Sequence, residues 1–372
     1  MVEAGGASLR VSSGEVVGRV VPVTIITGYL GSGKSTLLNF LLKANHGKRL
    51  AIIENEFSAG LGIEGMIAKS GVDDSNLGSF FELNNGCLCC TVKGDLLVTL
   101  EQLVLHKDRF DHIIIETTGV ANPGPVISTF WTDESLGSSL KLDGVVCVVD
   151  SSNLEFYLQA SDTGSDVRMQ ISYADRILLN KSDLVSPEEL AKTRHQVQSM
   201  NCMAEIRATS FANVGCDWIL GIDCYSVRNP LDAEVGGDNF CTPCGVAGPP
   251  SQHSASTLFS CSLSFAGSID LPKLKLFLDS ILYDNGRLLL PPAHGCATDD
   301  SMRIFRMKGV LHIKGESFIH ILQAVHDIFD IQPSQVERET GRDVSGGLNH
   351  VIIIGRSLDE ASISAGLRGC VS

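Results

Sequence analysis

The chain has 372 residues, of which 44% are hydrophobic and 19% are charged, and its formal net charge at pH 7 is −14. This length predicts about two globular domains, and the acidic balance argues against a general nucleic-acid surface or a polybasic membrane anchor. The sequence contains no run of 18 apolar residues, so we expect no membrane-spanning helix. Residues 1–18 lack the apolar core of a signal peptide. Twelve cysteines in such a chain indicate reduced thiols in the cytoplasm, some of them metal ligands.

The first 208 residues alternate between strand-like and helix-like segments. The opening segment, residues 20–27, is apolar enough for a strand that is buried on both faces. Such alternation predicts an α/β fold with a mostly parallel sheet flanked by helices. Strands are predicted at residues 20–27, 49–53, 112–115, 144–150, 176–179 and 205–208, and helices at 36–43, 95–106 and 187–199, the last with Ser186 as its N-cap.

The composition changes after residue 225, because Gly, Pro, Ser and Asn become frequent before residue 256. This segment is predicted to be a linker, followed by a smaller α+β domain. The predicted division is a flexible arm at 1–19, a P-loop domain at 20–225, a linker at 226–256 and a C-terminal domain at 257–372. In the C-terminal domain we expect strands at 258–265, 302–313 (one or two) and 351–355, and helices at 271–282, 316–329 and 358–367.

Residues 28–36 lie between the first strand and the first helix and match a phosphate-binding P-loop. Consecutive backbone N–H groups and the helix N-terminus form a concave anion site, and glycines let the backbone close around a phosphate. Lys34 is predicted to reach the β- and γ-phosphates, and Ser35 to offer its hydroxyl to Mg²⁺. The predicted nucleotide-binding residues of this loop are Gly28, Gly31, Ser32, Gly33, Lys34, Ser35 and Thr36.

A second nucleotide signal is Glu116, which closes the apolar strand at 112–115 and is followed by Gly119. A carboxylate at this position can order Mg²⁺ and its waters, or the attacking water, and the N–H of Gly119 can contact a γ-phosphate. Lys34, Glu116 and Gly119 are therefore the predicted catalytic residues. The Gly-rich residues 58–78 are a candidate switch region beside the same site.

The third signal is Asn180-Lys181-Ser182-Asp183, which follows the strand at 176–179. The Asp183 carboxylate can accept hydrogen bonds from N1–H and the 2-amino group of guanine, whereas adenine would leave it unpaired. Asn180 is predicted to hold the loop or contact the base, and the stem of Lys181 to lie over the ring. The motif therefore favours GTP over ATP.

A thiol cluster, Cys87-Leu88-Cys89-Cys90, lies between the P-loop and Glu116. Three thiols within four residues suit Zn²⁺ or Cu(I) better than Mg²⁺ or Ca²⁺, and three sulfurs leave one tetrahedral position open. Glu54 or Glu56 is a candidate for the fourth position, or for a place near Mg²⁺ instead. The pair Cys241 and Cys244, with His253 nearby, has metal-pair spacing without a second pair and is a weaker metal signal.

The order of these motifs resembles that of the CobW-type metallochaperone GTPases, and most closely the eukaryotic zinc-regulated GTPase metalloprotein activators. The resemblance extends to residues 142–145, to Tyr173-Ala174-Asp175 and to residues 303–312, so it covers most of the chain outside the arm and the linker. It implies a P-loop GTPase domain joined to a CobW-type C-terminal domain. It also implies GTP hydrolysis coupled to zinc transfer, with Cys87, Cys89 and Cys90 as zinc ligands.

The resemblance further implies a client metalloprotein, which is methionine aminopeptidase in the best-understood eukaryotic branch. The sequence departs from that branch at three places. No Cys-Pro-Glu-Leu-Val-Pro-like docking segment lies within residues 1–20, Ser58-Ala59 replaces the frequent Gly-Glu, and the linker is not His-rich. The client is therefore left open.

These observations together predict a GTP-hydrolysing zinc metallochaperone that uses GTP, Mg²⁺ and Zn²⁺. The thiol cluster lies between two nucleotide motifs, so the nucleotide state can bias its geometry. Two alternatives use the same residues: a GTP-gated zinc buffer or sensor that delivers nothing, and a chaperone for cobalt or nickel. The sequence predicts neither a nucleic-acid partner nor a membrane partner.

Overall fold

A computed structural model describes residues 19–54, 80–82, 92–132, 134–225, 258–283, 302–337 and 347–372. Its N-terminal unit is built on a seven-stranded sheet in the order β3-β2-β4-β1-β5-β6-β7, in which every pairing is parallel. The strands are β1 (Val21–Thr27), β2 (Leu50–Glu54), β3 (Phe80–Glu82), β4 (His112–Glu116), β5 (Leu140–Asp150), β6 (Arg176–Asn180) and β7 (Glu205–Ala208). The predicted parallel sheet is confirmed.

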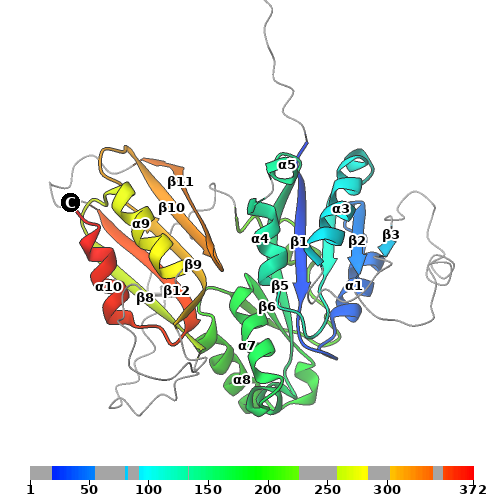
Figure 1. The fold of residues 1–372 in the computed structure, drawn as a ribbon. Coiled ribbons are helices and arrows are strands. Elements are labelled where there is room, and N and C mark those ends of the chain that lie inside the picture. The colour runs from blue at the N-terminus through cyan, green and yellow to red at the C-terminus, as the bar shows by residue number, and fades with distance from the viewer. Residues whose placement is uncertain are drawn as a thin grey trace, which may run out of the picture.

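Strand β1 lies in the middle of this sheet because its side chains are buried on both faces. Val21, Val23 and Ile25 pack into one hydrophobic cluster, whereas Ile26 packs into a second cluster on the opposite face. This two-sided burial is what a central parallel strand requires. The loop that follows β1 therefore begins at the centre of the carboxyl edge of the sheet (Figure 1).

Helices cover both faces of the parallel sheet. Leucines of α1 (Lys34–Lys43) pack in one cluster, and apolar residues of α3 (Val92–Val104), α4 (Gly124–Thr132), α7 (Gly164–Tyr173) and α8 (Pro187–Met200) pack in the other. The remaining helices are α5 (Glu134–Gly137), α6 (Leu154–Gln159) and the short 3₁₀ helices η1 (Lys107–Arg109), η2 (Ser182–Leu184) and η3 (Cys216–Trp218). The sequence predicted α1, α3 and α8 but not α4 to α7.

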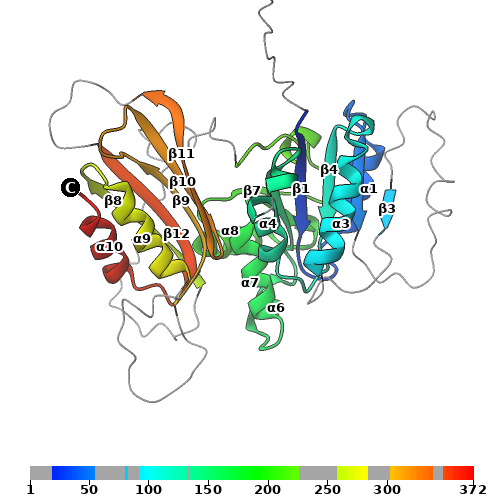
Figure 2. The same ribbon diagram turned by 45° about the horizontal axis from the view of Figure 1, so that its top comes forward.

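The C-terminal unit is a five-stranded antiparallel sheet in the order β11-β10-β9-β12-β8. Helices α9 (Leu271–Leu282) and α10 (Glu360–Gly369) lie on one side of it, and the N-terminal unit lies on the other (Figures 1 and 2). The strands are β8 (Leu258–Ala266), β9 (Arg303–Leu311), β10 (Phe318–Val325), β11 (Ile328–Glu337) and β12 (Leu348–Arg356). The predicted α+β class is confirmed.

The helix predicted at residues 316–329 is wrong, because this segment forms β10 and the start of β11. The two strands make an antiparallel hairpin in which Val325 pairs with Ile328, and His326 takes the left-handed φ of 58° at the turn. Short apolar runs suit a helix or a strand equally well by periodicity. Pairing of β10 with β9 and β11 on its two sides decides for the strand.

The two units share part of their core. Leu258, Phe305 and Val325 of the C-terminal unit belong to the hydrophobic cluster that α4, α7 and α8 form on the parallel sheet. Helix α7 contacts β9, and α8 contacts β8. Residues 1–18 of the arm predicted at 1–19, and the linker predicted at 226–256, lie outside the described residues.

Candidate functional site

The P-loop joins the end of β1 to the start of α1 and forms an anion cradle. The Lys34 ammonium donates hydrogen bonds to the carbonyl oxygens of Gly28, at 2.8 Å, and Tyr29, at 3.4 Å. Gly33 is the N-cap of α1 and adds no side-chain cap, so backbone N–H groups of the first helical turn face the loop. The buried Ser32 hydroxyl has no hydrogen-bond partner among the described residues. This geometry fits a phosphate.

Strand β4 brings Glu116 and Gly119 to the P-loop. Glu116 is 4% exposed and pairs in register with Ile26, one residue before the end of β1. A Cβ on Gly119 would lie 2.7 Å from the backbone nitrogen of Leu30, so only glycine allows this close approach to the P-loop. Glu116, at the end of β4, and Gly119, in the loop that follows it, therefore lie at the same edge of the sheet as the P-loop.

Asn180 ties two loops together at the end of β6. Its side-chain Nδ2 donates to the Ser32 carbonyl at 2.8 Å, and its Oδ1 accepts the Ala212 N–H at 2.9 Å. A Cβ on Gly33, which has φ 111°, would lie 2.2 Å from that Nδ2 atom. Asn180 thus fastens the P-loop to the loop after β7 through one N–H and one lone pair of its amide group.

Lys181 is held by Asp150, a residue that the sequence analysis missed. Lys181 takes a left-handed φ of 59°, and its ammonium donates to Asp150 Oδ2 at 2.7 Å. Burial raises the pKa of the Asp150 carboxyl, but hydrogen bonds from Lys181, Ser152 and Asn153 outweigh burial and hold the pKa below its ordinary value. The position of Asp150 at the end of a predicted strand was the available signal. The Asp183 carboxyl lies exposed in η2.

The loop after β7, residues 209–212, was also missed. Its Thr209 carbonyl accepts the Ser182 N–H at 3.1 Å, and the Ser210 and Ser182 hydroxyls lie 3.2 Å apart. Phe211 and Ala212 both take left-handed φ values, 53° and 54°. The loop therefore lies against the Asn180–Asp183 motif, where a base bound to Asp183 would reach it. A polar Thr-Ser pair after the sixth predicted strand was the available signal.

Family models match the chain in two consecutive parts. Residues 22–208 match the model described as CobW/HypB/UreG, nucleotide-binding domain, and residues 259–371 match the cobalamin synthesis protein cobW C-terminal domain. The chain belongs to the CobW/HypB/UreG family. Its P-loop, Glu116 and Asn180 motifs all lie within the first match.

Named relatives of this CobW-family chain cover nearly all of it. It is 35% identical to the Schizosaccharomyces pombe protein named Zinc-regulated GTPase metalloprotein activator 1, over 92% of this chain and 84% of that protein. Identity to the Saccharomyces cerevisiae protein of the same name is 31%, over 94% and 83%. The fold is similar to that of the Zn(II)-bound YjiA GTPase from Escherichia coli, with a TM-score of 0.67, 23% identity, and coverage of 95% and 100%.

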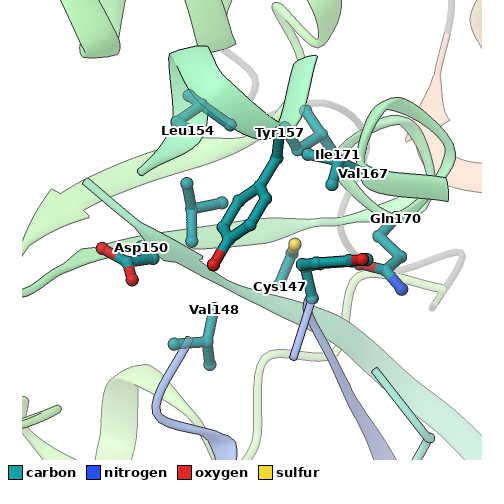
Figure 3. A pocket seen from close by; sticks show the side chains of 10 residues that line it. Cys147, Val148, Asp150, Leu154, Tyr157, Val167, Gln170 and Ile171 are labelled. Carbon is teal, nitrogen blue, oxygen red and sulfur yellow. The ribbon is translucent and has the colours of Figure 1, made fainter. Parts of the chain in front are cut away.

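A small pocket adjoins the P-loop of this family member (Figure 3). The Tyr157 ring lies across it with the hydroxyl toward Asp150 and Val148. This ring is tilted at 52° to the ring of Tyr29, with the two ring centroids 4.7 Å apart. Burial raises the pKa of the Cys147 thiol in its wall to about 12, so this cysteine is a neutral packing group and not a thiolate ligand. The pocket is lined by Tyr29, Cys147, Val148, Val149, Asp150, Leu154, Tyr157, Val167, Gln170 and Ile171.

The predicted zinc ligands Cys87, Cys89 and Cys90, together with Glu56, lie outside the described residues. The backbone of Glu54 ends β2 at the carboxyl edge, on the strand next to β4. Within the described ranges, no group of three His, Cys, Asp or Glu side chains could hold a metal ion. The same ranges contain no helix that is long and apolar enough to cross a membrane.

Proposed function

We propose that the protein hydrolyses GTP and uses the cycle to deliver Zn²⁺ to a client metalloprotein. The proposal of GTP binding rests on the two hydrogen bonds of the Asn180 side chain. They join the P-loop to the loop at 209–212, which lies beside the Asn180–Asp183 motif. Phosphate binding and guanine selection are thereby combined in one rigid unit. Strong discrimination against ATP is expected, because adenine leaves the Asp183 carboxylate unpaired.

In the proposed reaction Lys34 binds the β- and γ-phosphates, and Glu116 orients the attacking water or the waters of Mg²⁺. Ser35, exposed in the first turn of α1, and Glu116, at the adjacent strand end, are donors that suit this ion. The ion, when bound, neutralises charge that develops on the phosphate oxygens. Gly119 donates its N–H to the γ-phosphate and loses that contact after hydrolysis. Asp150 holds the Lys181 stem in place for the base.

Zinc is the proposed cargo, with Cys87, Cys89 and Cys90 as ligands and Glu54 or Glu56 as a fourth. Support comes from the donor set, which suits a thiophilic ion, and from relatives that are named as zinc-regulated activators. A fourth ligand that exchanges would let the ion pass to another protein. The cytoplasm is the proposed location, and methionine aminopeptidase is one client to test.

The test is GTP hydrolysis by protein purified without metal, measured alone and with Zn²⁺, Co²⁺ or Ni²⁺. Zinc should raise the rate at least several-fold in the wild type, and a Cys87/Cys89/Cys90→Ser variant should lose that response. Cys216→Ser, a half-buried thiol elsewhere in the fold, is the matched control and should respond normally. Unchanged zinc affinity and unchanged stimulation in the triple variant would overturn the zinc assignment.

Transfer is measured separately, by the activation of apo-methionine aminopeptidase and of other apo-metalloproteins in the presence of GTP. Zinc-loaded protein should activate a client faster with GTP than with a non-hydrolysable analogue. Stoichiometric zinc binding without transfer to any of them would favour a GTP-gated buffer. If Co²⁺ or Ni²⁺ stimulated hydrolysis and Zn²⁺ did not, the cargo would be assigned as cobalt or nickel instead of zinc.

A further inference from the structure

Helix α7 touches the loop that carries Gly119. The side chain of Gln170, which is 1% exposed, donates hydrogen bonds from Nε2 to the carbonyl oxygens of Gly119, at 2.9 Å, and Ala121, at 3.2 Å. In Figure 3 this residue stands in the pocket wall at the side away from Asp150. Both accepting carbonyls belong to the segment proposed to sense the γ-phosphate. Gln170 therefore sets the position of Gly119 without touching the nucleotide.

The last turn of the same helix touches the C-terminal domain. Tyr173 packs edge-on against Phe305 of β9, with ring centroids 6.0 Å apart. Its hydroxyl is buried without a hydrogen-bond partner among the described residues, and a Cβ on Gly124 would lie 2.7 Å from it. Tyr173 thus lies between β9 and the start of α4, which follows the Gly119 loop directly.

Arg306 of β9 completes this contact at the end of α7. Its guanidinium, in a side chain that is 1% exposed, donates to the carbonyl oxygens of Tyr173 and Ala174, each at 2.9 Å, and pairs with the carboxylate of Asp175. Lys308 lies 3.4 Å from the same carboxylate. A cation at a helix C-terminus satisfies carbonyls that have no partner within the helix. The Tyr173-Ala174-Asp175 motif therefore binds Arg306 and joins α7 to β9.

Asp175 also anchors this junction to the parallel sheet. Its second carboxylate oxygen accepts the Val145 N–H at 2.9 Å, and its backbone N–H donates to the Val145 carbonyl at 2.8 Å. Helix α7 therefore cannot shift at this end without disturbing β5 or β9. Gln170 and Tyr173 are three residues apart, about 4.5 Å along the helix axis. Less than one helical turn therefore separates the contacts of Gln170 with the Gly119 loop from the contacts of Tyr173 with β9.

From these contacts we infer that the last turn of α7 couples the Gly119 loop to the C-terminal domain, with Gln170 and Arg306 as positioning residues. The inference rests on the proposed GTP cycle, because the nucleotide state is what moves Gly119. A shift of the Gly119 carbonyl disturbs the hydrogen bond that Gln170 donates to it. The same turn of α7 accepts hydrogen bonds from Arg306 of β9. By linkage the coupling is reciprocal: contacts on the C-terminal domain bias the nucleotide affinities. A partner that binds the C-terminal domain would thus influence the GTP site.

The test compares backbone hydrogen exchange of the full chain with GDP and with a non-hydrolysable GTP analogue, both with Mg²⁺. In the wild type we expect amides of β9 and of residues 173–175 to differ between the two states by about fivefold or more. Gln170→Met keeps the side-chain length and removes both donated hydrogen bonds, so the difference should fall below about twofold. Ser260→Ala removes a different interdomain contact, the hydrogen bond to the Ser199 carbonyl, and should leave the difference intact.

A second variant keeps the test decisive if Gln170→Met folds poorly. Arg306→Lys retains a charge for Asp175 but cannot donate to both helix carbonyls as the guanidinium does. It should alter the ratio of GDP to analogue affinity by about fivefold or more. The coupling alone is overturned if the exchange difference persists in Gln170→Met and the affinity ratio is unchanged in Arg306→Lys. It is also overturned if a wild type that binds both nucleotides shows no exchange difference. Failure of the wild type to bind either nucleotide overturns the proposed GTPase function itself.

Discussion

At the scale of single residues, Asn180 joins the P-loop to the loop after β7. Its side-chain amide uses one donor and one acceptor for two loops that lie 148 and 32 residues away in the chain. It is 2% exposed, so either group would be costly to leave unpaired. Asp150 has a similar role for Lys181, since its carboxylate accepts a hydrogen bond from that ammonium at 2.7 Å.

Asn180→Ala should therefore weaken both folding and nucleotide binding. The loss of two buried hydrogen bonds predicts a fall of about 1–3 kcal/mol in the free energy of unfolding, measured in urea. GDP affinity should fall at least tenfold, by fluorescence titration, because the P-loop and the 209–212 loop lose their common anchor. Asn213→Ala changes an exposed side chain in the same region and should alter neither quantity. A loss of stability with unchanged GDP affinity would contradict this role of Asn180.

At the scale of elements, local capping determines where some helices begin, whereas pairing with distant strands determines the conformation of other segments. Helix α8 begins as its sequence predicts: Ser186 accepts the Glu189 N–H at 3.2 Å, and the Glu189 carboxylate accepts the Ser186 N–H at 2.8 Å. These partners lie within four residues, so the chain itself supplies them. The β10–β11 hairpin had no such local marker, and its strand state depends on β9.

Ser186→Ala should cost about 1 kcal/mol in the free energy of unfolding, because it opens the capping box at the start of α8. Urea unfolding followed by circular dichroism measures the change. Ser199→Ala, an exposed serine near the other end of the same helix, should cost less than half as much. Equal losses in the two variants would mean that the cap adds nothing beyond general helix propensity.

At the scale of the whole molecule, a buried polar group lies opposite the nucleotide edge. His112, at the start of β4, contacts the Thr24 hydroxyl at 2.8 Å and lies 3.8 Å from the Asp143 carboxylate. That carboxylate also accepts N–H groups of Gly221 and Ile222, which precede the linker. Burial lowers the pKa of His112 to about 4, against the opposing attraction of Asp143.

The folded protein should lose stability on mild acidification because of His112. The unfolded chain binds a proton there near pH 6.5 and the folded chain only near pH 4, so protons favour unfolding between these values. The contribution lost from pH 7 to pH 5 should be roughly 1–2 kcal/mol, measured by urea unfolding. His112→Gln should lose less than the wild type over this range, and exposed His195→Gln should behave like the wild type. Identical losses in all three proteins would refute the assignment.

The amino-acid sequence by itself determined which functional groups lie at the carboxyl edge of the parallel sheet. The P-loop, Glu116 and Asn180–Asp183 are each encoded within a few residues of a strand end, and parallel strands place their carboxyl ends together. Their identity and order were thus predictable without a structure. The zinc ligands were predicted in the same way, and they stay a prediction because Cys87, Cys89 and Cys90 lie outside the described residues.

Only the tertiary structure decided which residues support that edge. Asp150 holds Lys181 across 31 residues, Gln170 holds Gly119 across 51, and Arg306 pairs with Asp175 across 131. A strand end marks Asp150 as a candidate, but no local pattern shows which residue it contacts, because a hydrogen bond between distant residues depends on how whole strands and helices pack. The strand state of residues 318–325 has the same origin, since its hydrogen bonds go to β9 and β11. The residues of each nucleotide motif are consecutive in the sequence, whereas the residues that hold them in place come together only when the chain folds.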